Sequence, residues 1–303
     1  MTSLPWVWSP GYEADIGVHV YPTTKYRRIR DQLVDEGVLD ESVLRTPSPI
    51  SHEMLTVVHE AEWVDRVLEG RVTPLEEQKL ELPFSPELRD AFLLCCDGTV
   101  IAARLALEDG IAVHLGGGFH HAFAGHGEGF CLFNDVAVAA GVLVAEGAVE
   151  RVAVVDLDVH HGNGTAAIFR DRAEVFTFSM HEEANYPLIK PPGDLDVGLD
   201  GGTDDRSYLG LLRTHLPTVL DHDPDLMIYL AGVDPFKEDQ LGGLGLTRDG
   251  IRERDRMVLT AAREADVPVV VVLAGGYAIR ERDTVAMHCA TVAEAVLLFD
   301  QRA

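Results

Sequence analysis

The stretch VVDLDVHHGNGTAAIF, residues 154–169, shows the pattern that the rest of the chain repeats. It begins with apolar residues and then places Asp156, Asp158, His160 and His161 within six positions. Consecutive apolar residues without alternation are typical of a strand that is buried on both faces. Carboxylates and imidazoles are costly to bury without partners. Their place directly after such a strand therefore indicates a site that uses them together.

Five apolar runs end in this way, in polar residues or glycines. They are IAVHLGGGFHH (111–121), VAVVDLDVHHG (152–162), EVFTFSMH (174–181), LMIYLAGVD (226–234) and VPVVVVLAGGY (267–277). Segments with helical periodicity lie between or beside them, at residues 98–109, 134–149, 208–222, 251–266 and 283–300. This alternation predicts an α/β fold with an open, mostly parallel sheet and helices on both faces. Ligands of such sheets bind beyond the carboxyl ends of the strands, where all five polar clusters fall.

The length and composition indicate one large globular unit. The 303 residues contain no repeat and no low-complexity linker, so we expect a single domain over residues 1–303. The N-terminus lacks a basic head followed by an apolar stretch, and no apolar run is long enough for a membrane helix, so we expect a cytoplasmic protein without a membrane partner. The four cysteines show no CxxC spacing, which favours reduced thiols.

The chain is strongly acidic, with a formal net charge of -25 at pH 7. Such a charge repels phosphate backbones and argues against direct binding of nucleic acid. It is compatible with a cationic substrate, but the acidic residues are scattered along the chain. We therefore interpret the charge mainly as a contribution to solubility.

Asp158 and His160 have the spacing of a metal chelate. In an extended backbone, residues two apart point the same way, and Asp156 shares that direction. Catalytic zinc takes three protein ligands and keeps one position open. Asp234, which follows another apolar run, is the best-placed third ligand. One Asp-x-His pattern is usually only a pair of polar strand-end residues, but the gathering of several such groups at strand ends favours a metal site.

Other residues at the strand ends suit proton transfer and oxyanion binding. His120 and His121 follow a run of three glycines, and histidine is the usual general base near neutral pH. Asp156 and Asn163 are available to fix their tautomers. Tyr277 follows two glycines at the end of another run, and its phenol is able to donate to a developing oxyanion.

These residues resemble the histone deacetylase superfamily, which has the arginase/deacetylase fold, and especially its compact class IV type. The resemblance covers nearly the whole chain. Its motifs are GVHVYPTTKY, CDGTVIAA, HLGGGFHHAFAGHGEGFCLFNDVAVAA, VVDLDVHHGNGT, TFSMH, YLAGVDPFKEDQLGGLGLT and LAGGYA. It implies a zinc-dependent amidohydrolase that removes an acetyl or longer acyl group from an amine such as a lysine side chain, with ferrous iron as an alternative metal.

The resemblance also implies a role for each site residue. The metal ligands would be Asp158, His160 and Asp234. His121 would be the general base and acid, with His120 paired to Asp156 beside it, and Tyr277 would stabilise the oxyanion. The family's substrate tunnel would be lined by Gly129, Phe130, Tyr186 and Leu241. A structural potassium ion would lie near Asp156, Asp158, His160, Ser179 and Met180.

The chain departs from the family pattern at three positions. Asn163 stands where class I enzymes have an aspartate, as in class II and class IV relatives, and a neutral partner raises the imidazole pKa less than a carboxylate does. Ala274 replaces the first glycine of a longer glycine run, which stiffens the turn before Tyr277. Tyr186 stands where many relatives have phenylalanine, so the polarity of the tunnel and the acyl preference stay open.

Three alternatives remain from the sequence. In the first, the substrate is an acetylated polyamine or another small-molecule amide rather than acyl-lysine. In the second, the protein binds acyl-lysine without turnover. In the third, it is a binuclear manganese ureohydrolase of the same fold. The last needs a further carboxylate after the Asp-x-His pair, where this chain has Gly162.

Overall fold

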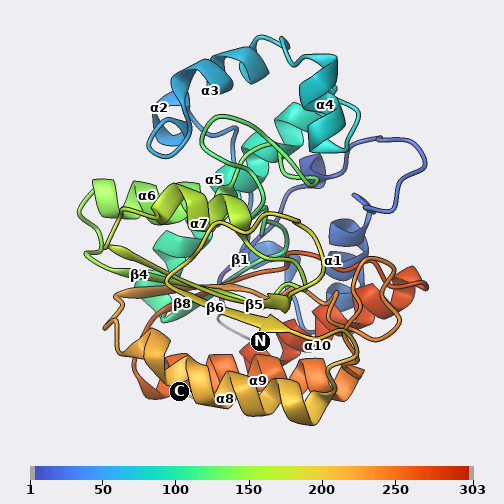
Figure 1. Ribbon diagram of the computed structural model, residues 1–303, viewed down its shortest axis with the longest axis vertical. Coiled ribbons are helices and arrows are strands. Elements are labelled where there is room, and N and C mark those ends of the chain that lie inside the picture. The colour runs from blue at the N-terminus through green and yellow to red at the C-terminus, as the bar shows by residue number, and fades with distance from the viewer. Residues whose placement is uncertain (1–3, 300–303) are drawn as a thin grey trace.

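A parallel sheet of eight strands forms the centre of the protein, as the computed structural model shows for residues 4–299 (Figure 1). The order across the sheet is β2-β1-β3-β8-β7-β4-β5-β6, and every neighbouring pair is parallel. The strands are β1 (Trp6–Val7), β2 (Leu44–Arg45), β3 (Ile111–His114), β4 (Val152–Asp156), β5 (Val175–Glu182), β6 (Leu195–Leu199), β7 (Leu226–Leu230) and β8 (Val269–Val272). The predicted open parallel sheet is confirmed.

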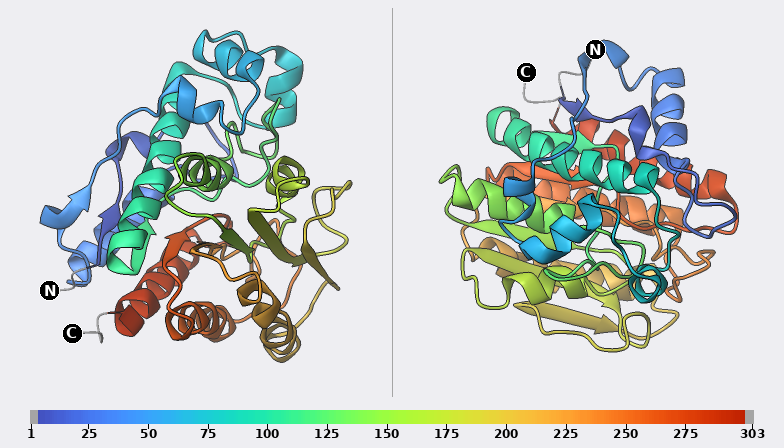
Figure 2. Two further views of the ribbon diagram at one scale, coloured as in Figure 1. Left: turned by 90° about the vertical axis from the view of Figure 1, so that its left-hand side faces the viewer. Right: turned by 90° about the horizontal axis from the view of Figure 1, so that it is seen from above.

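Helices cover both faces of this sheet (Figures 1 and 2). One face carries α5 (Pro86–Asp109), α6 (Asp135–Ala145) and α7 (Asn163–Phe169). The other face carries α8 (Asp205–Leu220), α9 (Arg248–Glu264) and α10 (Glu281–Phe299), with α1 (Lys25–Asp35) packed against α10. The shorter helices are α2 (His52–Leu55), α3 (Ala61–Leu68) and α4 (Pro74–Leu80), with 3-10 turns at Pro10–Tyr12 and Glu41–Val43. In the part of the chain described, no helix is both long and apolar enough to cross a bilayer.

The five predicted strands are present as β3, β4, β5, β7 and β8, and three further strands were not predicted. β1 and β2 have two residues each, too few to show a periodic pattern. β6 lies at the edge of the sheet, and its sequence LDVGL alternates buried and exposed positions instead of forming an apolar run. A rule that looks for strands buried on both faces misses such an edge strand.

The strand expected through His160 ends earlier, at Asp156. Beyond that point single backbone bonds to β7 and β5 remain, at Leu157 and Val159, but other N–H groups bond to nearby side chains. Asp158 N–H donates to Asp156 Oδ1 at 3.1 Å, and His160 N–H donates to Asp158 Oδ1 at 3.0 Å. Aspartates often compete with a ladder in this way. The parity argument for these residues was therefore wrong about the backbone, although the side chains do converge.

Candidate functional site

The carboxyl ends of four neighbouring strands are aligned by the sheet register. Asp156 of β4 pairs with Leu230 of β7, Leu230 pairs with Val272 of β8, and Val272 pairs with His114 of β3. The loops that follow these residues therefore start at the same edge of the sheet. This alignment brings the predicted site residues, which are far apart in the sequence, into one region.

Asp158, His160 and Asp234 form a buried cluster at this edge. One ligating atom from each lies within 4.8 Å of the others. His160 Nδ1 is 3.0 Å from Asp158 Oδ1 and 3.5 Å from Asp234 Oδ2. Backbone N–H groups hold both carboxylates, since Gly275 donates to Asp158 Oδ2 and Val159 donates to Asp234 Oδ1, each at 2.8 Å. The three predicted ligands thus face one another on a fixed frame.

The cluster has the chemistry of a divalent cation site. Asp234 Oδ2 is buried and has no hydrogen-bond partner among the described residues. Burial and the charge of Asp158 raise the pKa of Asp234 to about 7. Burial opposes a charged imidazole, but the carboxylates of Asp158 and Asp234 raise the pKa of His160 to about 10. Two carboxylates and one imidazole around an unpaired oxygen fit zinc, which takes three such protein ligands at catalytic sites.

His120 and His121 lie beside this cluster with different partners. His120 Nδ1 is 2.6 Å from Asp156 Oδ2, and despite burial the carboxylates around His120 raise its pKa to about 9. His121 Nδ1 donates to Asn163 Oδ1 at 2.7 Å, which leaves Nε2 with its lone pair. Burial, and then the charges of His120 and His160, lower the pKa of His121. One imidazole is therefore held protonated and the other neutral, 3.2 Å apart between their Nε2 atoms.

The loop that carries these histidines is tied to the core by Asp135. Its carboxylate accepts the N–H groups of Gly118 and Phe119 at 2.7 to 3.1 Å, and its Oδ2 also accepts from Thr99. Asp135 itself begins α6, so the helix fixes the loop. His120 and His121 are thereby placed by a rigid element, as a catalytic constellation requires.

Tyr277 stands over the same pocket on a constrained turn. Its N–H donates to Asp239 Oδ2 at 2.6 Å. The buried Lys25 donates to the carbonyl of Ala274 at 2.6 Å and lies 5.8 Å from the centre of the Tyr277 ring. Ala274 has a positive φ of 51°, and a Cβ on Gly118 would lie 2.5 Å from Ala274 Cα. The turn before Tyr277 therefore depends on a glycine in the facing loop.

One pocket reaches two residues of this cluster, Asp158 and His160. It is also lined by His121 and Tyr277 and by all four predicted tunnel residues, Gly129, Phe130, Tyr186 and Leu241. The ring of Tyr186 meets that of His121 edge-on, with centroids 4.9 Å apart. The structure therefore brings the predicted tunnel residues and the predicted catalytic residues His121 and Tyr277 into one pocket.

Three of the five predicted potassium ligands lie on two neighbouring strands, and the other two lie in the loop after β4. Asp156 of β4 pairs with Ser179 of β5, and Met180 follows on the same strand. Asp158 and His160 come from the loop after β4. The potassium ion itself stays a prediction.

The sequence analysis missed Glu128, which contacts several site residues. Its Oε1 accepts from Asn163 Nδ2 at 2.7 Å and from the Tyr186 hydroxyl at 3.2 Å. Partial burial opposes its charge, but hydrogen bonds from His126, Asn163 and Lys79 lower the pKa of Glu128 to about 2. Lys25, described above, was missed as well. Both are charged residues in segments that the fold buries. Rules based on residue spacing do not detect such residues.

Comparison with known proteins agrees with this geometry. The family model of the histone deacetylase domain matches residues 19–293. An uncharacterized protein of Picosynechococcus sp. is 41% identical over 287 residues, which cover 94% of this chain and 96% of that protein. Histone deacetylase 2 of Arabidopsis thaliana is 32% identical, with 86% and 70% covered, and a histone deacetylase-like amidohydrolase of Pseudomonas aeruginosa is 33% identical, with 90% and 75% covered.

A solved structure supports the fold. The crystal structure of the HDA15 HD domain superposes with a TM-score of 0.77 at 24% sequence identity, over 100% of this chain and 89% of that one. The chain belongs to the histone deacetylase domain family, and with it to the deacetylase-type amidohydrolases. The predicted family is confirmed, and the class IV assignment stays a prediction.

Proposed function

We propose that this histone deacetylase family member is a zinc-dependent hydrolase that removes an acyl group from an acylated amine, with acyl-lysine as the substrate class. The observation that supports it is that one pocket is lined by two residues of the buried ligand cluster, a neutral imidazole and a phenol. Each of these groups serves a separate need of amide hydrolysis, namely cation binding, proton transfer and oxyanion stabilisation.

Asp158, His160 and Asp234 would hold the cation. When bound, a zinc or ferrous ion polarises the amide carbonyl and lowers the pKa of a water molecule. The unpaired Oδ2 of Asp234 and the nearby Nδ1 of His160 are the atoms that such an ion would satisfy. Backbone N–H groups already hold the carboxylates of Asp158 and Asp234, so both are positioned before a cation binds.

His121 would move the proton. Its Nδ1–H is held by Asn163, so Nε2, which lies 3.2 Å from Nε2 of His120, is the atom that would take a proton from the attacking water. The same imidazole, once protonated, returns a proton to the departing amine, so that one group serves both halves of the reaction. His120, kept protonated by Asp156, makes the surroundings of His121 cationic and keeps its pKa low. This arrangement favours a neutral base before the attack.

Tyr277 would donate its hydroxyl to the tetrahedral oxyanion. Burial and the nearby carboxylates of Asp158 and Asp234 raise the pKa of Tyr277, so the phenol keeps its proton. A protonated phenol is a donor, which is the role that oxyanion stabilisation requires.

The walls of the pocket support an acylated amine with an apolar stem. Phe130 and Leu241 offer apolar surface, and Phe130 packs between the rings of Tyr21 and Tyr277 with centroids 6.0 Å away on either side. The chain of a lysine or a polyamine fits such walls equally well. We infer acyl-lysine from the family. The acyl group is acetyl or a longer chain, and the resemblance to class IV is what brings the longer chains into the proposal.

The proposal is tested with a panel of acetyl-lysine peptides, longer acyl-lysine peptides and acetylated polyamines. Each is assayed with the zinc-loaded chain, after chelation and after zinc is restored. We expect hydrolysis of acyl-lysine that chelation abolishes and zinc restores. A preference for acetylated polyamines would contradict acyl-lysine as the substrate class. A zinc-loaded chain that hydrolyses none of these compounds would contradict the proposed reaction and indicate a binding protein without turnover.

A further inference from the structure

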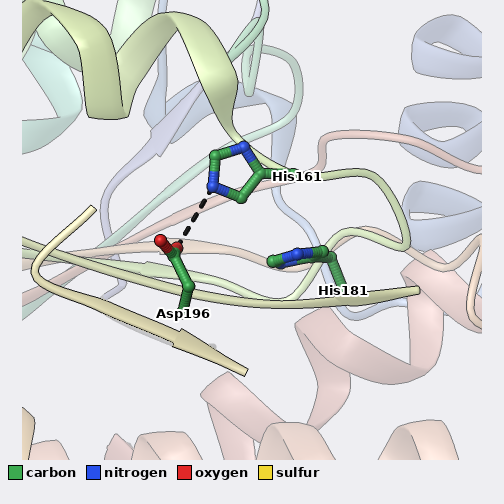
Figure 3. Close-up of side chains that lie close together, drawn as sticks. All are labelled: His161, His181 and Asp196. Carbon is green, nitrogen blue, oxygen red and sulfur yellow. Dashed lines mark hydrogen bonds and ion pairs between the residues drawn. The ribbon is translucent and has the colours of Figure 1, made fainter. Parts of the chain in front are cut away.

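A second cluster of ligating side chains lies on the other side of the loop that follows β4. It consists of His161, which directly follows the proposed ligand His160, with His181 of β5 and Asp196 of β6 (Figure 3). We propose that these three residues form a second binding site for a divalent transition-metal ion, separate from the cluster of Asp158, His160 and Asp234. This inference is independent of the reaction proposed above.

The geometry of the cluster is close to that of a three-ligand site. His161 Nε2 is 3.1 Å from Asp196 Oδ1, and one ligating atom of each residue lies within 4.8 Å of the others. The imidazoles of His161 and His181 meet edge-on, with centroids 4.6 Å apart. Ligands on one tetrahedral zinc ion are about 3.3 Å apart, given metal–ligand lengths of about 2.0 Å. Small rotations of the side chains would therefore close the site.

The register of two strands builds this cluster. Asp196 pairs with Ser179, and His181 lies two residues after Ser179 on β5, so both ligands project from the same face of the sheet. Figure 3 shows His161 reaching down to them from the segment that leads into α7. The site thus joins two paired strands, β5 and β6, to the segment that leads into α7.

Outer partners orient two of the three ligands. The Ser179 hydroxyl is 2.9 Å from His181 Nδ1, and Gly193 N–H donates to Asp196 Oδ2 at 2.8 Å. These bonds use Nδ1 of His181 and Oδ2 of Asp196, so Nε2 of His181 and Oδ1 of Asp196 are the atoms available to an ion. Metal-binding imidazoles and carboxylates have such partners on their other atoms. Burial also lowers the pKa of His181 to about 4, so its imidazole is neutral at neutral pH.

A fourth ligand is within reach at the solvent side. Glu183 Oε2 lies 3.7 Å from His181 Nε2. The Glu183 side chain crosses over Gly198, where a Cβ would lie 2.2 Å from Oε2. Gly198 pairs with His181 on the facing strand, so the absence of a side chain there opens the path. Glu183 is exposed and is free to approach an ion.

The donor set identifies the class of cation. Two imidazole nitrogens with one or two carboxylates suit Zn²⁺, Co²⁺, Ni²⁺ or Cu²⁺. Ca²⁺ and Mg²⁺ prefer oxygen ligands alone, and a potassium ion at Ser179 and Met180 would also use oxygens. Nitrogen ligands therefore distinguish this site from the potassium site expected nearby. An ion here would link β5 and β6 to the loop that carries Asp158 and His160, and would stabilise the fold by mass action.

Metal stoichiometry tests the proposal on the full, tag-free chain. The protein is stripped with chelator and dialysed against Co²⁺ in excess, and bound metal is measured by mass spectrometry and by the d–d absorption of Co²⁺. We expect one more ion per chain in the wild type than in His181→Ala or Asp196→Asn. His222→Ala, in the turn after α8, is the matched control. Its ring packs against Phe176 and not against the cluster, so this variant should keep both ions.

The Asp234→Asn variant distinguishes two independent metal sites from one binuclear centre. We expect that variant to lose the first ion and keep the second, whereas an ion bridged to the first would be lost with it. A wild type that binds one ion, or cluster variants that bind as many ions as the wild type, would overturn the proposal. Because His181 is buried, unfolding of His181→Ala is checked by circular dichroism, and Asp196→Asn, at a partly exposed side chain, provides the independent result.

Discussion

His160 and His161 are neighbours in sequence, but they belong to clusters of different character. His160 faces two buried carboxylates, and Asp234 Oδ2 among them has no hydrogen-bond partner in the described part of the chain. His161 faces one carboxylate, Asp196, whose two oxygens both accept hydrogen bonds and whose side chain is 29% exposed. The first cluster has two buried carboxylates and an unpaired carboxylate oxygen. In the second, both oxygens of the single carboxylate have partners, and the unpaired buried atom is Nδ1 of His161. We therefore expect the first to control activity and the second to affect mainly metal content and stability.

The largest effect is expected at the first cluster. Asp234→Asn removes one of two buried carboxylates, and the loss of cation binding should lower kcat/KM by about a thousandfold or more, since Lewis-acid stabilisation supplies several kcal/mol. Metal content and kcat/KM are measured together. Asp196→Asn is the matched control, and the comparison fails if both variants lose activity to the same extent.

His121→Ala should lower kcat by at least about a hundredfold, because a positioned general base contributes that much. The variant should still bind zinc, since His121 is not among the three ligands of the first cluster. Steady-state rates and zinc content are measured on the same preparation. Near-normal turnover in this variant would contradict the proposed role of His121.

Tyr277→Phe should lower kcat by about a hundredfold through loss of one oxyanion donor. Tyr186→Phe, which removes another hydroxyl from the same pocket, is the control and should change the rate much less. Equal losses of kcat in the two variants would mean that the rate depends on the polarity of the pocket and not on donation from Tyr277.

Glu128→Gln tests how the base is positioned. The change removes the charged acceptor of the Asn163 amide, a contact of about 1.5 kcal/mol or more, so we expect kcat to fall about tenfold with little change in KM. Glu81→Gln, at another acidic residue of the pocket lining, is the control. A purely structural role would lower the thermal midpoint without separating kcat from KM.

The smallest effect on activity is expected at the second cluster. His181→Ala should change kcat/KM of the zinc-loaded protein by less than about threefold, because His181 touches none of the proposed catalytic residues. Adding Co²⁺ or Zn²⁺ should raise the thermal midpoint of this variant less than that of the wild type. A large loss of turnover here would show that the two clusters are coupled through residues 157–162.

The sequence predicted the parts of this protein that depend on continuous local patterns. Five buried strands, the flanking helices and the residues at the strand ends all follow from apolar runs and their abrupt polar ends. The sequence did not predict β6 or the second cluster, because His181 and Asp196 face each other only through the register of two strands. Glu128 and Lys25 were missed for the same reason, since each acts on a segment far away in the chain.

The most direct test of the account is where a zinc ion binds. Crystals of the zinc-loaded protein, measured with anomalous diffraction at the zinc edge, should show a peak about 2.0–2.2 Å from carboxylate oxygens of Asp158 and Asp234 and from Nδ1 of His160. Absence of a peak between these three side chains in zinc-saturated crystals would contradict the account.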